Sequence, residues 1–137
     1  LELARELGAD DAFDYSRPGW ERELGGLDVV FDGVGGAIGR AAFEALRPGG
    51  RMCSFGLAGG SFTRAGEDEA SAREVALVHL SRMTPELMTE LTIEALAEAA
   101  AGRLRPVIGQ TFPLERAAGA HAAIEARATV GKTLLIV

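Results

Sequence analysis

Short apolar runs alternate with segments of helical periodicity along the chain. The run LDVVFD at 27–32 has three apolar residues in succession, without the polar alternation of a half-exposed strand. Such a run is typical of a strand covered on both faces, as in parallel sheets. Helical spacing follows from 36 to 46, and the apolar run RMCSFG occupies 51–56. The predicted apolar stripe of the helix consists of Ile38, Ala42, Ala45 and Leu46.

The same alternation continues on both sides of this segment. Residues 1–7 have helical spacing, and Gly8 stands where a left-handed C-terminal cap is expected. Thr84-Pro85-Glu86 predicts a helix start, because the hydroxyl can cap the first turn and proline fits there. Further strands are predicted at 12–15, 75–80, 107–114 and 132–137 (the last one buried), a helix at 115–127, and a loop at 57–72. This order predicts an α/β fold with a mostly parallel sheet.

Composition and charge limit the class of partner. The 137 residues make one domain or part of one, and 47% apolar with 25% charged residues is an ordinary globular composition. The net charge of −6 would repel a polyanion, so nucleic acid and anionic membranes are poor partners. No apolar run approaches the roughly 20 residues of a membrane span. Because the chain has one cysteine and no visible signal peptide, we expect a cytoplasmic location.

Four glycines lie where the strand at 27–32 turns into the next helix: Gly33, Gly35, Gly36 and Gly39. At this edge of a doubly wound sheet, glycines let the backbone approach a phosphate or a ring, and the helix N-terminus favours an anion. The spacing is G-x-G-G-x-x-G, so the third glycine of the dinucleotide fingerprint falls on Ile38. Two interpretations therefore stay open, a ligand wall and a tight turn that requires small residues.

Few other residues are candidates for chemistry. Asp32 ends its strand, where a carboxylate could contact a ligand hydroxyl, but we favour hydrogen bonds to the N–H groups of the turn. His79 and His121 lack the further ligands of a zinc site, and we expect both to be packed and hydrogen-bonded. We expect Cys53 to be a small buried side chain and the acidic run 67–69 to be a solvated loop. No catalytic residue and no metal site is assigned.

Four stretches, in order and at natural spacing, resemble a known family. LGADDAFDY, LDVVFDGVGG and LRPGGRMCSFGLAGG resemble cofactor-domain segments of medium-chain dehydrogenases/reductases, and the tail from Gly102 is similar to their quinone-oxidoreductase-like branch. The resemblance implies a partial Rossmann-like, doubly wound parallel sheet. It also implies hydride transfer from NADP(H), with NAD possible, to a small-molecule quinone, enone or similar activated double bond. The zinc ligands of zinc-binding dehydrogenases lie upstream of the matching segment.

The resemblance also implies which residues contact the cofactor. They are Tyr15 near the adenosine end, Gly33, Val34 and Gly35 along the adenine and ribose, Phe55 and Gly56 beside the nicotinamide half, and Val78 in the strand that flanks the nicotinamide. His79 lies in the same strand, and Leu57 departs from the polar residue expected at its position. No catalytic residue is implied within this chain.

The family pattern places this chain within a larger protein. Residues 1–137 would be the C-terminal part of the nucleotide-binding domain, with 107–137 returning to a catalytic domain outside the chain. Two strands of the family sheet would lie between 12–15 and 27–32, so the strand at 27–32 would have an unpaired edge, which is sticky. We therefore expect this part alone to be inactive and to need its upstream partner or a second copy. The family also implies a homodimer through Val75–Leu80.

Two other classes of function are compatible with parts of the sequence. A methyltransferase-like α/β domain also uses LDVVFD followed by a helix and L-x-P-G-G, which would put Asp32 near a transferred methyl group. That interpretation does not explain the run FGLAGG or the end GKTLLIV. A non-catalytic dimerisation module, formed through Val75–Leu80, is the second alternative.

Overall fold

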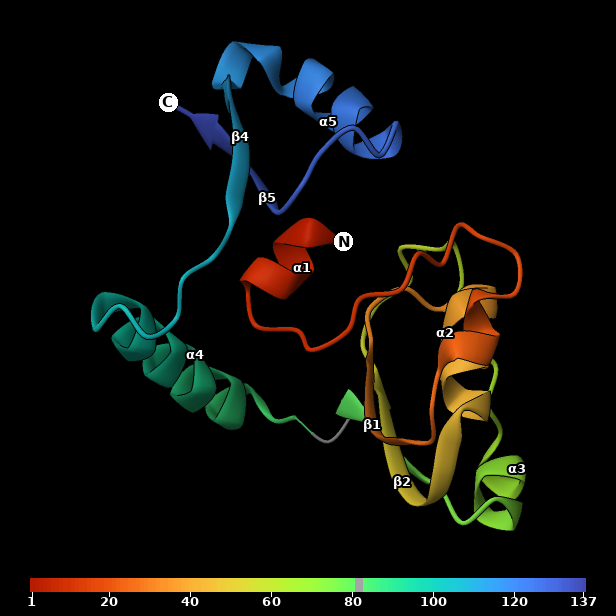
Figure 1. The fold of residues 1–137 in the computed structure, drawn as a ribbon. Helices are drawn as coiled ribbons and strands as arrows, with labels where there is room; N and C mark the ends of the chain where they lie inside the picture. Colours follow the sequence, from red (N-terminus) through yellow and green to blue (C-terminus); the bar gives the residue numbers. More distant parts are fainter. Residues whose placement is uncertain (81–82) are drawn as a thin grey trace. The chain divides into compact units, whose positions relative to one another are not determined.

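The computed structural model describes residues 1–80 and 83–137 and falls into two compact units, 1–82 and 83–137 (Figure 1). Each unit has its own parallel sheet, and helices alternate with the strands along the chain. This alternation confirms the predicted α/β class. No helix among the described residues is long and apolar enough to span a membrane.

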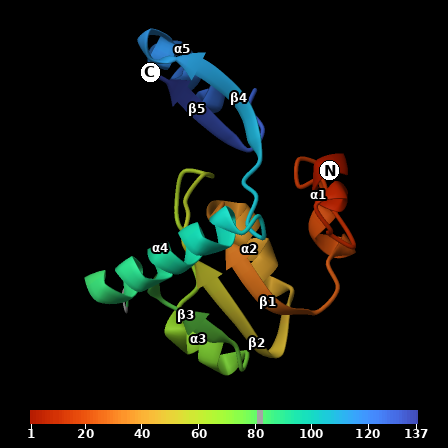
Figure 2. The ribbon, with the colours of Figure 1, turned by 90° about the vertical axis from the view of Figure 1, so that its left-hand side faces the viewer.

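Three parallel strands form the sheet of the first unit, in the order β1–β2–β3 (Figure 2). Helices α2 and α3 follow β1 and β2 in the chain. The bounds are Leu27–Asp32 for β1, Gly36–Glu44 for α2, Leu46–Ser54 for β2, Glu67–Ala72 for α3 and Ala76–Val78 for β3. In the ladder Val30 is opposite Met52 and Asp32 is opposite Ser54, so β1 and β2 end level with each other. This level edge positions the candidate site.

The core of this unit is centred on Phe43 of α2, which is completely buried. Its buried neighbours in the core are Val30, Leu46, Met52, Ala70 and Val75. The predicted stripe of α2 omitted Phe43, whereas Ile38 and Ala42 are only partly buried. Phe43 is buried through tertiary contacts that helical spacing does not indicate. The guanidinium groups of Arg40 and Arg73 lie 5.3 Å and 5.5 Å from the centroid of its ring. Cation–π contacts of this kind favour an aromatic ring at that place.

Helix α3 is held against α2 by one arginine. Arg40 donates to both carboxylate oxygens of Glu69, at 2.8 Å and 2.5 Å, and its Nε donates to Glu44 Oε1 at 2.7 Å. These bonds raise the pKa of Arg40 and lower that of Glu69. Residues 67–69 form the first turn of α3, where the positive end of the helix dipole favours carboxylates. The prediction of a loop through residue 72 is therefore wrong for 67–72.

Two predictions for the start of the first unit differ from the structure. Residues 12–15 form no strand, and β1 is buried on one face only, because Phe31 on the other is 77% exposed. Among the described residues β1 pairs with β2 alone, and the segment 12–15 forms no ladder with either strand. The short helix α1 (Glu2–Glu6) ends before Gly8, whose φ of 101° confirms the predicted cap. A 3₁₀ turn, η1, spans Trp20–Glu23.

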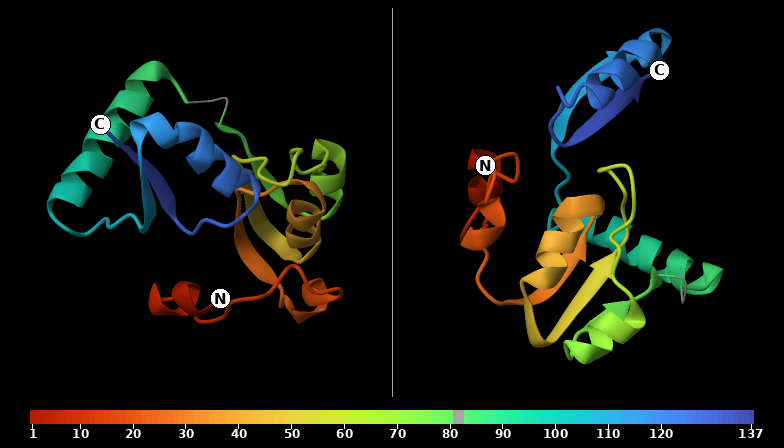
Figure 3. Two further views of the ribbon diagram at one scale, coloured as in Figure 1. Left: turned by 90° about the horizontal axis from the view of Figure 1, so that it is seen from above. Right: turned by 90° about the vertical axis from the view of Figure 1, so that its right-hand side faces the viewer.

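The second unit contains two helices and a two-stranded parallel sheet (Figure 3). Helix α4 (Pro85–Ala100) begins as predicted, with Thr84 Oγ1 accepting the N–H of Leu87 at 3.2 Å. Strand β4 (Ile108–Pro113), the turn η3 (Leu114–Arg116), helix α5 (Ala117–Glu125) and strand β5 (Lys132–Ile136) confirm the other elements predicted here. β5 is mostly exposed, so the prediction that it is buried is wrong for this unit, in which its one strand partner is β4.

Shortening Phe43 to alanine will destabilise the first unit strongly. Phe43→Ala leaves a cavity between the sheet and the two arginines, and we expect the free energy of unfolding to fall by about 3–5 kcal/mol. Urea unfolding of the full-length protein, followed by circular dichroism, measures the change. Phe62→Ala, which removes a ring that is 54% exposed, is the control and should cost less than about 1 kcal/mol. Equal losses in the two variants would contradict this account of the core.

Candidate functional site

The candidate site lies where β1 and β2 end at the same edge of the sheet. Gly33 follows β1 and Phe55 follows β2. The N–H groups of Phe55 and Gly56 both donate to the carbonyl oxygen of Asp32, at 2.9 Å and 3.3 Å. A Cβ on Gly33 would come 3.2 Å from the Phe55 ring, so the two segments are in contact. In open α/β sheets, ligands bind outside the carboxyl ends of the strands, which is the position of this pair.

Asp32 is buried at the centre of this edge, with 5% of its surface exposed. Its Oδ1 accepts the N–H groups of Val34 at 3.0 Å and Gly35 at 2.7 Å. Its Oδ2 accepts the hydroxyl groups of Ser54 at 2.9 Å and Thr63 at 2.6 Å. The two bonds to N–H groups confirm the predicted turn role. Four accepted hydrogen bonds use the lone pairs of both oxygens, so Asp32 has no capacity left for a ligand hydroxyl.

Burial and hydrogen bonding act in opposite directions on this carboxyl group. Burial raises the pKa of Asp32, but the hydrogen bonds from Thr63, Gly35, Ser54 and Val34 together lower it more, to a net value below the ordinary 3.8. The carboxylate form therefore dominates at neutral pH. Its negative charge lies beside the N-terminus of α2, where the helix dipole also favours it.

The glycines at this edge allow the chain to pack closely on itself. Gly35 has φ of 74°, and a Cβ there would collide with the carbonyl oxygen of Ser61. A Cβ on Gly39 would collide with the Thr63 hydroxyl and the Asp32 carboxylate. These contacts support the tight-turn interpretation at both positions. At Gly33 the nearest side chain is the Phe55 ring, and that position remains a candidate for the ligand wall.

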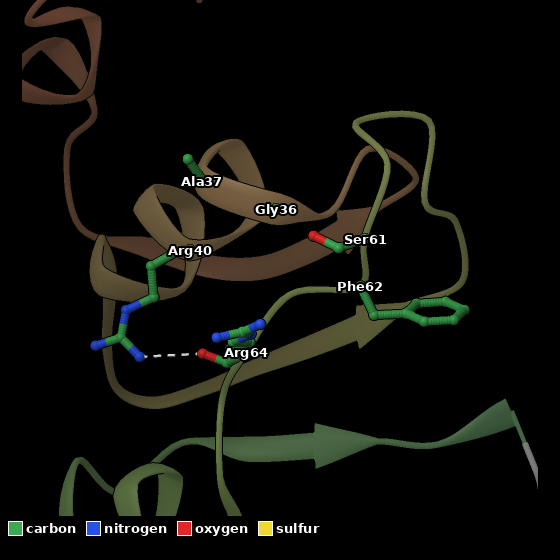
Figure 4. Close-up of a pocket in the computed structure, with 6 residues that line it drawn as sticks. All are labelled: Gly36, Ala37, Arg40, Ser61, Phe62 and Arg64. Atoms are coloured by element: carbon green, nitrogen blue, oxygen red, sulfur yellow. Dashed lines mark hydrogen bonds between the residues drawn. The ribbon is translucent and has the colours of Figure 1, made fainter.

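A hollow of about 440 Å³ is lined by the start of α2 and by residues of the segment 61–64 (Figure 4). Arg40 lines it and donates to the carbonyl oxygen of Arg64 at 3.2 Å, while Phe62 points away from Arg40. The N–H of Gly36 donates to the carbonyl oxygen of Ser61 at 2.8 Å. Because Arg40 is already paired with Glu44 and Glu69, its charge is not available to a bound anion.

A larger hollow of about 600 Å³ lies along β1 and the start of α2. Tyr15, Gly33 and Val34 line it, so the structure brings together three of the seven residues that the resemblance assigns to the cofactor. Tyr15 packs edge-on to Trp20, with ring centroids 6.4 Å apart. Phe55 adjoins the hollow through its contact with Gly33.

The other assigned residues lie elsewhere at this edge. Gly35 and Gly56 face the chain itself, because a Cβ on Gly56 would collide with the Gly33 backbone. Val78 lines a separate hollow of about 200 Å³, together with Ser54, Thr63 and His79. Sequence analysis missed Ser54 and Thr63. The parallel register could have indicated Ser54, since it pairs with Asp32, whereas nothing in the sequence indicates that Thr63 returns to this strand end.

Neither the histidines nor the cysteine is among the hydrogen-bond partners of the Asp32 side chain. His79 is exposed, and its Nε2 lies 2.6 Å from Glu67 Oε1, so it is hydrogen-bonded as predicted but not packed. His121 is exposed while its neighbour Ala120 is buried, so the prediction that His121 packs in the helix face is wrong. Cys53 is a partly buried free thiol. Across residues 1–80 and 83–137, no group of three or more potential metal ligands comes together.

Comparison with known proteins gives consistent matches over almost the whole chain. The family model described as zinc-binding dehydrogenase matches residues 7–135. A quinone oxidoreductase of Pseudomonas aeruginosa is 31% identical over 147 aligned residues, which cover 98% of this chain and 45% of that protein. A 2-haloacrylate reductase of Burkholderia is also 31% identical, with 98% and 44% covered. The chain thus spans less than half the length of these curated relatives.

Solved structures match at similar levels. The quinone oxidoreductase of Escherichia coli, complexed with NADPH, superposes with a TM-score of 0.81 at 27% identity, covering 99% of this chain and 46% of that one. A mycobacterial protein complexed with NADPH superposes with a TM-score of 0.81 at 29% identity, covering 99% and 45%. These neighbours confirm the Rossmann-like fold class of the chain.

The lowered pKa of Asp32 predicts how stability depends on pH. A carboxyl group whose folded pKa lies below its unfolded value contributes stability that is fully present above the unfolded value, near 3.8, and is lost as pH falls through the folded value. Wild type should therefore lose stability below about pH 4, and Asp32→Asn should be less stable at pH 7 and show a flatter acid dependence. Urea unfolding of the full-length protein across pH 2–7 tests this. Asp10→Asn, an exposed change outside the helices and strands, should leave the profile unaltered, and an unaltered profile for Asp32→Asn would refute the assignment.

Proposed function

The chain belongs to the family of zinc-binding dehydrogenases, and we propose that it forms part of the nucleotide-binding domain of an NADP(H)-dependent oxidoreductase. The observation that carries this proposal is the contact between Gly33 and Phe55 at the carboxyl edge of two parallel strands, with Val34 and Tyr15 beside them. The relatives named as quinone oxidoreductase and 2-haloacrylate reductase, and the neighbours solved with NADPH, support the choice of cofactor and reaction class.

The polar groups of the turn restrict how it can meet a nucleotide. The N–H groups of Val34 and Gly35 donate to Asp32, and the carbonyl oxygen of Val34 accepts the N–H of Gly59 at 2.7 Å. This turn therefore offers no spare N–H groups at 34 and 35 for a phosphate, which suits contact with adenine and ribose better than with pyrophosphate. Gly33 presents backbone without a side chain, and Tyr15 supplies an aromatic surface.

The remaining assigned residues complete the proposed cofactor contacts. Gly35 and Gly56 keep the backbone close enough for Val34 and Phe55 to reach the ligand, and Phe55 and Val78 offer apolar surface beside the nicotinamide. Bound NADPH would supply a hydride from its nicotinamide ring to an electron-poor carbon of a quinone, an enone or a similar double bond. The residues described here bind and orient, and none is assigned a proton-transfer role.

The domain arrangement of the family extends the proposal. Residues 1–137 would form the C-terminal part of the nucleotide-binding domain, and 107–137 would return to a catalytic domain outside this chain. The assignment to part of a larger nucleotide-binding domain is supported by β1, which has one strand partner among the described residues. The return of 107–137 to another domain is supported by the separate β4–β5 sheet. The family zinc ligands would lie outside this chain, which alone would be inactive, and the location would be cytoplasmic.

A homodimer through Val75–Leu80 is also proposed. β3 is the last strand in the order β1–β2–β3 and, among the described residues, has a strand partner on one edge only. Val78 and Leu80 are exposed apolar side chains, which suits a strand-to-strand interface. This feature would equally serve a non-catalytic dimerisation module, the second candidate. The family match argues against the methyltransferase-like alternative.

A charge at Phe55 tests the proposed cofactor site. In the full-length protein, Phe55→Asp should weaken NADPH binding about tenfold or more, because a carboxylate would be desolvated beside the ring and would repel the phosphates. Titration of tryptophan fluorescence or calorimetry gives the dissociation constant. Leu96→Asp, which puts the same charge at an exposed apolar position of α4, is the control and should change the affinity less than about twofold. Unchanged affinity in Phe55→Asp would exclude the assigned pocket.

Exposed apolar side chains in both sheets predict how the isolated 137 residues behave. Val29 and Phe31 of β1 and the apolar side chains of β5 are largely exposed, so the isolated chain should self-associate or unfold without cooperativity. Circular dichroism melting and sedimentation velocity measure both properties. A monomer that melts in one sharp transition would show that the upstream part is not required for folding.

A further inference from the structure

Two segments that the proposed function places beside the cofactor are joined to a third segment through one carboxylate. Oδ1 of Asp32 binds the turn that carries Val34 and Gly35. Its Oδ2 binds Ser54, which directly precedes Phe55, and Thr63, which is 31 residues away in the sequence. The side chain therefore joins both proposed contact segments, 33–35 and 55–56, to a third segment, 61–63, which the sequence pattern predicts to be part of a loop.

The Oδ2 bonds exceed what the turn needs. An aspartate that organises a turn requires only the local N–H bonds, and in Asp32 these are made by Oδ1 alone. The bonds from Ser54 and Thr63 are long-range and connect β1 with the end of β2 and with the segment 61–63. With both oxygens engaged, neither the position nor the orientation of the carboxylate can change without breaking a charge-assisted hydrogen bond.

The packing of α2 supports this arrangement independently. Gly39 lacks the Cβ that would collide with the Thr63 hydroxyl and with Asp32. Gly35 likewise leaves room for the carbonyl oxygen of Ser61, which accepts the N–H of Gly36. The segment 61–63 is thus seated against the start of α2 at two points, and one of them is the hydroxyl that binds Asp32.

We propose that Asp32, Ser54 and Thr63 are positioning residues of the nucleotide site, which hold the turn 33–35 at a set distance from Phe55 and Gly56. This inference rests on the proposed function, since the distance matters only if both segments contact the same cofactor. Asp32 itself has no free oxygen for a hydrogen bond to the cofactor, because both of its oxygens are fully used. Loss of one hydroxyl donor should therefore loosen the spacing and weaken cofactor binding without removing any contact to the cofactor.

Thr63 gives the sharpest test, because it lies outside the strands and two near-isosteric changes separate hydroxyl from shape. In the full-length protein, Thr63→Val removes the donor and keeps the volume, whereas Thr63→Ser keeps the donor. We expect the KM for NADPH to rise about tenfold in Thr63→Val with kcat changed less than about threefold. Thr63→Ser should lie within about threefold of wild type in both. Thr92→Val, which removes a hydroxyl bonded to the Met88 carbonyl within α4, is the matched control and should change neither.

Amide hydrogen exchange without nucleotide provides a readout that does not depend on activity. In Thr63→Val the N–H groups of Val34 and Gly35 should exchange about tenfold faster than in wild type, because their acceptor is less well held. The amides of Phe43 and Met52 should keep their wild-type rates. Thr63→Ser should restore slow exchange at 34 and 35.

The outcomes separate the two proposals. Faster exchange at 34 and 35 together with weaker NADPH binding, both rescued by serine, supports the positioning role. Unchanged exchange, or faster exchange with unchanged NADPH affinity, overturns it while leaving the proposed function standing. If the wild-type full-length protein does not bind NADPH, the proposed function fails, and the positioning role for a nucleotide fails with it.

Discussion

The structure of the candidate site depends on a buried carboxylate that accepts four hydrogen bonds. A buried charge is costly unless it is fully hydrogen-bonded, so the fold must place hydrogen-bond donors around the Asp32 carboxylate. Two of them are backbone N–H groups of the following turn, and two are hydroxyl groups from distant parts of the chain. This requirement explains why Gly39 and Gly35 are glycines, because each leaves space for the segment that brings Thr63 to Asp32.

A second set of contacts holds the helices on the same face of the sheet. Two guanidinium groups lie close to the Phe43 ring, and one of them, from Arg40, is also paired with Glu69 of α3. The other, from Arg73, donates to the carbonyl oxygens of Glu44 and Leu46 where α2 ends. Exposed ion pairs contribute little to stability on their own. Here the Arg40–Glu69 pair connects α2 with α3, and Arg40 also contacts the buried Phe43 ring. The segment 61–63 lies between these two fixed helices along the chain.

The apolar surface that remains exposed agrees with the domain arrangement proposed from the family. β1 has one strand partner among the described residues, and Phe31 on its outer face is 77% exposed. Relatives are more than twice as long as this chain, and the matching segment covers 45% of the Pseudomonas protein. An apolar strand of this kind is stable when a further layer or strand covers it, so this surface is where a larger protein would add to the sheet.

Most of the elements could be predicted from the sequence, because they depend on local signals. Periodicity predicted β1, α2, β2, α4 and α5, the Thr84 cap began α4, and Gly8 ended α1, all of which require only neighbouring residues. The turn role of Asp32 was also predictable, since its first two donors are two and three residues away. Three features depend on tertiary contacts. Thr63 returns to Asp32, Phe43 is the centre of the core, and 67–69 begins a helix that is paired with Arg40. Each of these depends on contacts between residues more than 20 positions apart, which periodicity and local propensity do not encode.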